Sequence, residues 1–430
     1  MKKIFLVTTM ILVWSSLVFA QYERWLYRYE ENPVNDCAYS TVFGGDGNIY
    51  AAGYYCNAVG GDYDIFVISL TATGTFRWIY TYDGPGSGGN DIAYAITYGT
   101  DRNIYVAGKS DSLGGLQFTV IKLDRFGAQQ WIYKCRQFST FPHCDEARAI
   151  VYGPDNYIYA AGRIENSFPN SDFAVVKLDQ NGNCIAPFPR LLDLVGNSDV
   201  AYSIVYGSDN NLYIAGCGAH SPPSSSNFVV VSYTNAGSWQ WTYPYSRGPQ
   251  NTAYSIVYGS DNNLYVAGFS DSLDQYHDFL VQSLYTSNGG RRWSYRFRES
   301  PLGGAVAHSI TYGNGNVYAA GFASQSSAWS DFLVLSLQSN GDFRWKKYFG
   351  SPGDMSDMAN SVVYGLDGNI YAAGFITVAN QARDFAIVSL TSDGGERWPA
   401  PYLYNNSNGN DEAFAIVYGL DDQLYAAGYS

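Results

Sequence analysis

The chain has 430 residues and a formal net charge of −13, and only 15% of its residues are charged. No basic stripe accompanies this acidic balance, so the composition argues against a nucleic-acid-binding protein. Tyrosine (39 residues) and glycine (45 residues) are abundant, as expected for half-buried strands joined by tight turns. We therefore expect an all-β chain.

The first 20 residues predict a secretory signal peptide, with cleavage after Ala20. Lys2 and Lys3 form a basic start, and a short apolar stretch follows from residue 4 to residue 19. A retained membrane anchor is the alternative, although threonine and serine interrupt the apolar stretch. We expect the remaining chain, residues 21–430, to be a secreted or periplasmic monomer without a membrane-spanning segment.

One short segment recurs along the chain and predicts a repeat architecture. Its clearest copies are Ala201–Gly216 and Ala253–Gly268, and the copies begin near residues 38, 93, 147, 201, 253, 307, 359 and 413. Successive copies start 52 to 55 residues apart. A fixed period of this size indicates units that bury their faces only against their neighbours.

The third repeat shows how one unit divides into strands. Strands are predicted at Ala147–Tyr152, Tyr157–Ala161 and Asp172–Leu178, separated by segments with turn chemistry or by a variable loop. A fourth strand follows, and in other repeats it carries a tryptophan. These tryptophans are Trp78, Trp131, Trp241, Trp293, Trp345 and Trp398. Four strands in about 54 residues is the size of a propeller blade.

The strand pattern predicts an eight-bladed β-propeller of four-stranded antiparallel blades. Strands such as Phe279–Leu284 are apolar on both faces, which suits radial stacking better than a β-solenoid. The last repeat stops at Ser430, while Trp25–Tyr29 lacks a blade of its own. We therefore expect this N-terminal strand to close a last blade of three strands. An incomplete chain is the alternative.

The repeated segment resembles a known family of repeats. Its pattern Ala-x-Ser-Ile-Val-Tyr-Gly-x-Asp-x-Asn-Leu-Tyr-x-Ala-Gly is similar to the bacterial beta-propeller repeats called SBBP, and Asp172–Gly182 resembles the delta-60 repeats. Glycine followed four residues later by tryptophan, as in Gly127 and Trp131, is similar to the tryptophan-docking repeats of quinoprotein propellers. The third repeat lacks that tryptophan. The resemblance covers residues 25–430 and implies a propeller fold with no particular activity.

Six cysteines in an exported chain allow up to three disulfide bonds. The predicted pairs are Cys37–Cys56 and Cys135–Cys144. Cys184 and Cys217 are expected at opposite ends of their blades and not to pair with each other.

Most of the repeated residues have expected structural roles. We expect each tryptophan to dock between neighbouring outer strands, and Tyr213 and its counterparts to pack between blades. The run Asp209–Asn211 suits a hairpin turn; a calcium site is the alternative. No metal site or cofactor is predicted, because the four histidines lack the spacing of metal ligands.

The candidate binding residues stand at the start of the first strand of each repeat. An aspartate precedes the leading alanine by two residues in six repeats: Asp36, Asp91, Asp145, Asp199, Asp357 and Asp411. The residue after that alanine varies, and the candidates there are Tyr39, Tyr94, Arg148, Tyr202, Tyr254 and His308. If this strand is innermost, both sets surround one mouth of the channel, on the face with the variable loops. The alternative for the aspartates is that they accept backbone hydrogen bonds that tie blades together.

No catalytic constellation is present in the sequence, so we expect a non-enzymatic scaffold. Tyrosines beside acidic groups predict binding of a carbohydrate or a protein partner on the loop-rich face. A structural role in a cell-envelope assembly is one alternative. A quinoprotein-like or polysaccharide-cleaving enzyme is the other, and it would require convergent catalytic groups at the channel mouth.

Overall fold

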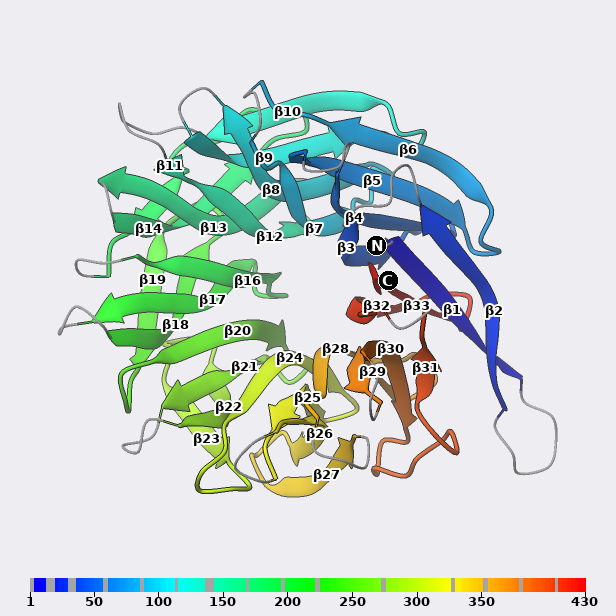
Figure 1. The fold of residues 1–430 in the computed structure, drawn as a ribbon. Coiled ribbons are helices and arrows are strands. Elements are labelled where there is room, and N and C mark those ends of the chain that lie inside the picture. The colour runs from blue at the N-terminus through cyan, green and yellow to red at the C-terminus, as the bar shows by residue number, and fades with distance from the viewer. Residues whose placement is uncertain are drawn as a thin grey trace.

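The computed structural model describes residues 4–12, 20–29, 36–56, 61–85, 89–112, 115–135, 143–167, 170–194, 198–220, 225–271, 276–325, 329–350, 355–378, 382–406 and 409–430. All elements of these residues are strands, and they form eight sheets arranged radially around a central opening (Figure 1). The prediction of an all-β propeller with four-stranded antiparallel blades is confirmed.

Seven blades are each built from consecutive strands, with the first strand innermost. Blade 1 contains β3 (Cys37–Phe43), β4 (Asn48–Cys56), β5 (Tyr63–Thr71) and β6 (Phe76–Tyr82). Blade 2 contains β7 (Ile92–Tyr98), β8 (Ile104–Ser112), β9 (Gly115–Leu123) and β10 (Gln129–Cys135), with the short β11 (His143–Cys144) parallel to β9. Blade 3 contains β12 (Glu146–Tyr152), β13 (Ile158–Ser167), β14 (Asn170–Leu178) and β15 (Arg190–Leu192). Blade 4 contains β16 (Val200–Tyr206), β17 (Asn211–His220), β18 (Ser225–Thr234) and β19 (Trp239–Tyr245).

The remaining consecutive blades follow the same order. Blade 5 contains β20 (Asn251–Tyr258), β21 (Asn263–Asp271), β22 (His277–Tyr285) and β23 (Arg291–Phe297). Blade 6 contains β24 (Ala305–Gly313), β25 (Asn316–Ala323), β26 (Asp331–Gln338) and β27 (Phe343–Phe349). Blade 7 contains β28 (Met358–Tyr364), β29 (Ile370–Thr377), β30 (Arg383–Leu390) and β31 (Tyr402–Tyr404).

The closing sheet joins the two ends of the chain. Its strands, from the channel outward, are β32 (Glu412–Tyr418), β33 (Leu424–Tyr429), β1 (Ile4–Leu12) and β2 (Ala20–Tyr29). With this sheet in place, the innermost strands contact one another all the way round, and β32 meets β3.

The predicted three-stranded last blade is wrong, because β1 occupies its third position. Thr8 pairs with Tyr425 on one side and with Trp25 on the other. In blade 7, Ser389 of the third strand pairs with Tyr371, the residue equivalent to Tyr425. The segment predicted as a signal peptide therefore supplies a ladder strand here, and its removal would take that strand out of the closing sheet. Signal-peptide cleavage itself stays a prediction.

The first hairpin of every blade except blade 6 is organised by the repeated aspartate and tyrosine. In blade 5 one oxygen of Asp261 accepts the Asn263 backbone N–H at 3.3 Å, and the other accepts the Tyr265 hydroxyl at 2.6 Å. Asn262 has φ +59°, which asparagine tolerates well in a turn. The tyrosine is fully buried and stacks on Tyr312 of the next blade at 5.1 Å. The equivalent buried tyrosines are Tyr50, Tyr105, Tyr159, Tyr213, Tyr318, Tyr371 and Tyr425. The predicted packing role of the tyrosines is confirmed.

Outer tryptophans dock most of the blades onto a turn of the next blade. Trp78 Nε1 donates to the Arg125 carbonyl at 3.0 Å, and its ring lies against Gly127, which has φ +87°. The equivalent docking tryptophans are Trp25, Trp131, Trp241, Trp293 and Trp345. Blade 3 lacks the tryptophan, and Phe188 takes its place against Gly237 of blade 4. The predicted docking role is confirmed for Trp78, Trp131, Trp241, Trp293 and Trp345. Trp398 is also buried, but its Nε1 has no hydrogen-bond partner among the described residues.

Candidate functional site

Each of the eight inner strands carries a β-bulge at the residue after the leading alanine. In blade 1 the pairing with β4 shifts between Ala38 and Ser40, so Tyr39 is the extra residue. A bulge bends its strand and re-aims the side chain of the extra residue. The eight bulged residues form what we call the collar: Tyr39, Tyr94, Arg148, Tyr202, Tyr254, His308, Asn360 and Phe414.

The glycine that ends the repeated segment makes room for this bulge. A Cβ atom on Gly162 would lie 1.9 Å from the Glu146 carbonyl oxygen, which is closer than any real contact. The same clash, at 1.8 to 2.1 Å, occurs at each equivalent glycine of the second strands: Gly53, Gly108, Gly216, Gly268, Gly321, Gly374 and Gly428. The repeated Ala-Gly ending therefore permits the close strand approach that positions the collar.

The collar surrounds a cavity of about 420 Å³ in the channel. Its lining residues are Tyr39, Tyr94, Arg148, Tyr202, Asn360 and Phe414. Four of these were candidates from the sequence, whereas the candidates Tyr254 and His308 belong to the collar but not to the lining. A cavity of this size falls in the range of about 300–1,000 Å³ typical of small-ligand sites.

Neighbouring collar side chains contact one another around the channel. The Tyr39 ring lies 5.1 Å from that of Phe414 and 6.0 Å from that of Tyr94. The Tyr202 and Tyr254 ring centroids are 5.4 Å apart. Burial raises the pKa of Tyr39 to about 12, so this lining phenol keeps its proton at neutral pH. The cavity wall is therefore largely aromatic, and the Tyr39 hydroxyl in it is neutral.

A second variable layer supports the collar from behind. It consists of the residue after each glycine of the second strand, which pairs with the residue before the leading alanine, as Arg163 pairs with Glu146. Tyr54 packs on Tyr39 at 5.6 Å, and Phe269 packs on Tyr254 at 5.9 Å. This layer was missed from the sequence. The sequence did contain an indication of this layer, because the residue that follows the constant Ala-Gly pair varies from one repeat to the next.

Arg148 is held in the cavity wall by one buried carboxylate and two aromatic rings. Its Nε lies 2.6 Å from Glu146 Oε1, and its guanidinium carbon lies 5.1 Å from the Tyr94 centroid and 5.3 Å from the Tyr202 centroid. Arg163 Nε also contacts Glu146 Oε1, at 3.0 Å. The Glu146 side chain is only 2% exposed, so it lies behind the lining rather than in it.

A second glutamate supports Asn360 in the same way. Asn360 Nδ2 donates to Glu412 Oε1 at 2.9 Å and to the Ala413 carbonyl at 2.8 Å. The other oxygen of Glu412 accepts the Tyr429 hydroxyl at 3.0 Å and lies 3.4 Å from Arg383 Nη1. Glu412 thus forms an ion pair with one cation, Arg383, and its hydrogen bond with Asn360 fixes that amide in the lining.

The six candidate aspartates lie in the walls of the ring and not in the cavity lining. Each is at most 2% exposed. Asp91 shows their role: its two carboxylate oxygens accept the backbone N–H groups of Asp111 and Gly84, both at 3.1 Å. These bonds join the end of a second strand to the connection between blades. The arrangement matches the structural alternative considered for these aspartates.

His308 is half-buried among its neighbours in the collar. Its Nδ1 lies 3.3 Å from the Ala359 carbonyl oxygen, and its ring packs against Tyr254 at 5.7 Å and Phe322 at 5.8 Å. Burial lowers the pKa of His308 from its ordinary value of 6.5 to about 4. The imidazole is therefore neutral at pH 7.

This depressed pKa predicts a pH-dependent term in stability. The unfolded chain takes up the His308 proton first as the pH falls, so about 3 kcal/mol of stability present above pH 6.5 is lost by about pH 4. Urea unfolding of the protein and of His308→Gln should give a difference in free energy that changes by this amount over that range. Burial raises the pKa of Asp411 to about 6, which acts in the opposite direction, but it acts equally in both proteins. A difference that does not vary with pH would contradict the prediction.

The predicted disulfide bonds are wrong. The register pairs Cys37 with Tyr54, two residues before Cys56, and no disulfide joins the two cysteines. A diagonal separation of that kind exceeds the distance that a disulfide spans. Cys135 is a buried thiol in the core between blades 2 and 3 and takes part in no disulfide. The side chain of its predicted partner, Cys144, lies outside the described residues.

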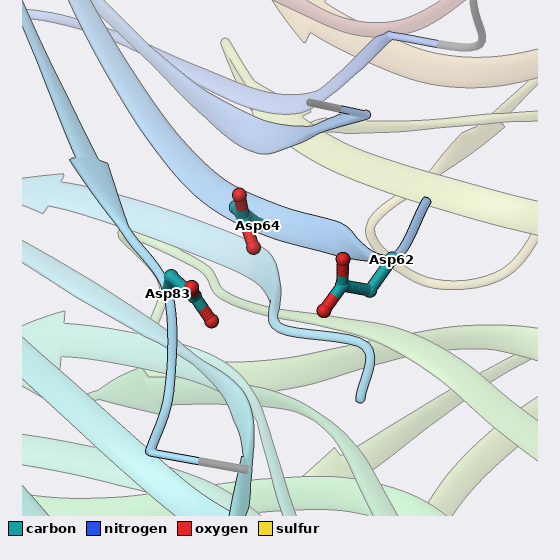
Figure 2. A group of neighbouring side chains, drawn as sticks. All are labelled: Asp62, Asp64 and Asp83. Carbon is teal, nitrogen blue, oxygen red and sulfur yellow. The ribbon is translucent and has the colours of Figure 1, made fainter. Parts of the chain in front are cut away.

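Three aspartates form an acidic group at the outer part of blade 1. Figure 2 shows Asp62 and Asp64 near the start of β5 and Asp83 just after β6. One carboxylate oxygen of each lies within 4.8 Å of the others. Acidic side chains commonly gather without an ion, and no metal is assigned to them.

No helix long and apolar enough to cross a membrane occurs among the residues that the structure describes.

No protein-family model and no curated protein sequence matches the chain, so the resemblance to SBBP repeats stays a prediction. Solved structures of the same architecture do match. Sqt1 from Chaetomium thermophilum, bound to the N-terminus of a ribosomal protein, aligns with TM-score 0.53 and 11% identity over 92% of this chain and 97% of its own. A quinohemoprotein alcohol dehydrogenase from Pseudomonas putida aligns with TM-score 0.51 and 10% identity over 89% and 72%. A puromycin hydrolase aligns with TM-score 0.51 and 9% identity over 92% and 58%. At these identities the likeness shows a β-propeller fold and nothing of the activity.

Proposed function

We propose that this chain is an exported, non-catalytic β-propeller scaffold that binds a carbohydrate in the collar cavity. The observation that carries the proposal is the composition of the lining, which has four aromatic rings beside one guanidinium and one amide. Aromatic faces stack on the apolar faces of sugar rings, and fixed polar groups hydrogen-bond the hydroxyls. The six lining residues include no carboxylate, thiol or imidazole, which supports binding rather than catalysis.

A glycan array probed with the full chain tests this proposal. We expect a clear hit whose affinity falls about tenfold or more in Tyr94→Ala and further in Tyr94→Ala with Tyr202→Ala, because each change removes a stacking surface. Tyr285, half-exposed at the end of β22, provides the matched control. Tyr285→Ala should bind as the unchanged protein does.

Two results would count against carbohydrate binding in the collar. A hit that both cavity variants retain would place the site elsewhere on the molecule. If folded protein bound no glycan on the array, the result would favour protein recognition or a role in envelope assembly instead. The Sqt1 neighbour, which holds a protein segment, makes protein recognition the second candidate.

A further inference from the structure

The cavity lining holds a single charged group, and that group is a cation. Arg148 is the only ionisable residue with a permanent charge among the six lining residues. The protein as a whole carries a net charge of −13. A cationic lining in an acidic chain selects for anionic ligands at this one place.

Arg148 lines the cavity and contacts Glu146 through Nε rather than through its two terminal nitrogens. Nε makes the bond to Glu146, and within the described part of the chain no residue accepts a hydrogen bond from Nη1 or Nη2. The side chain is 31% exposed although it sits inside the channel. The rings of Tyr94 and Tyr202 hold the guanidinium in place. Two parallel N–H donors in a fixed plane match the two oxygens of a carboxylate.

The carboxylate that pairs with Arg148 is shared with a second cation. Glu146 Oε1 is shared by two guanidinium groups, those of Arg148 and Arg163. In contrast, Glu412 on the other side of the collar contacts one cation, Arg383. A ligand carboxylate at Arg148 would therefore give this guanidinium an anionic partner that it does not have to share with Arg163.

We infer that the collar cavity selects an acidic sugar, a pyranose that carries a carboxylate, as in hexuronic acids. The carboxylate binds Nη1 and Nη2 of Arg148, and the sugar ring lies against the aromatic wall. This inference rests on the proposed carbohydrate binding and names its ligand class. The aromatic wall would hold a neutral sugar, and Arg148 adds the preference for the charged one.

Calorimetric titration of the full chain with a galacturonic acid trimer and with a galactose trimer tests the inference. We expect the acidic trimer to bind at least about tenfold more tightly at low salt, with the preference reduced as salt is raised. Arg148→Gln should weaken the acidic trimer about 10- to 100-fold and the neutral trimer much less, so that the preference for the acidic trimer is lost. Arg148→Lys keeps the charge but loses the paired donors, so it should retain part of the preference. Arg125→Gln, at an exposed turn, is the matched control.

The outcomes separate this inference from the proposed function. Equal binding of both trimers, unchanged in Arg148→Gln but weakened in Tyr94→Ala, would overturn the acidic preference and leave carbohydrate binding standing. Tighter binding of a sulfated galactose trimer than of the galacturonic acid trimer would overturn the assignment of a carboxylate. Absence of binding by any trimer to folded protein would overturn both. If Arg148→Gln does not fold, full retention of the preference by folded Arg148→Lys would contradict the paired-donor geometry.

Discussion

Replacing Gly162 with alanine is expected to destabilise the protein by about 3 kcal/mol or more. The added methyl group would lie 1.9 Å from the Glu146 carbonyl oxygen, so β12 and β13 would have to separate at the bulge. That shift would move Glu146 and Arg148 together and disturb the cavity wall. Chemical unfolding should show a lower midpoint, and binding of the acidic trimer should weaken in the variant that remains folded.

Gly304 supplies the control for this prediction. A Cβ atom there would meet nothing within 4 Å, and its backbone needs no left-handed conformation. Gly304→Ala should therefore change stability by no more than about 0.5 kcal/mol. If Gly162→Ala were as stable as Gly304→Ala, the close approach of the two strands would not be required for the bulge.

Trp241→Ala is expected to lower the free energy of unfolding by about 3–5 kcal/mol. The indole is 7% exposed, packs on Tyr213 at 5.8 Å, and donates to the Thr286 carbonyl at 2.9 Å in the next blade. Its loss leaves a void between blades 4 and 5 and an unpaired turn. Because the ring of blades closes on itself, a weakened joint should lower the stability of the whole molecule, as measured by thermal unfolding.

Trp239 provides the control for this prediction, because it is a tryptophan on the same strand that does not dock onto the next blade. It lies two residues earlier on β19, and it is 59% exposed. Trp239→Ala should cost well under half of the effect of Trp241→Ala, since it opens no void between blades. Equal costs would show that the docking contact contributes little.

The repeat allowed much of the ring to be predicted from the sequence. A tryptophan or tyrosine that returns at the same place in each repeat has the same neighbours in each blade, so one argument covers all copies. The collar positions were recognisable for the opposite reason, because they vary inside a nearly constant segment. Tyr94 and Arg148 are examples, and both line the cavity.

What could not be predicted depends on contacts across strands. The bulge is a shift in strand register, and no pattern within a single strand predicts it. The glycine that permits the bulge nevertheless recurs in every blade. The link between Glu146 and Arg163 follows from that register, since the residues are distant in sequence and paired in space. Phe188 was missed because it reaches the docking position of blade 3 from outside the usual glycine-to-tryptophan spacing. The third strand of the closing sheet was missed because its residues have the composition of a leader sequence.

The placement of all eight collar residues on bulges has a consequence for how ligand specificity can evolve. A bulged residue stands apart from the ladder of backbone hydrogen bonds, so exchanging its side chain leaves the pairing of the strands in place. This chain already carries tyrosine, arginine, histidine, asparagine and phenylalanine at equivalent positions. Two proteins built from these blades can therefore share most of their sequence and recognise different ligands. Their ligand preferences are best compared through the identities of the eight collar residues. A library randomised at those eight positions alone should yield proteins that bind new ligands and keep the same propeller fold.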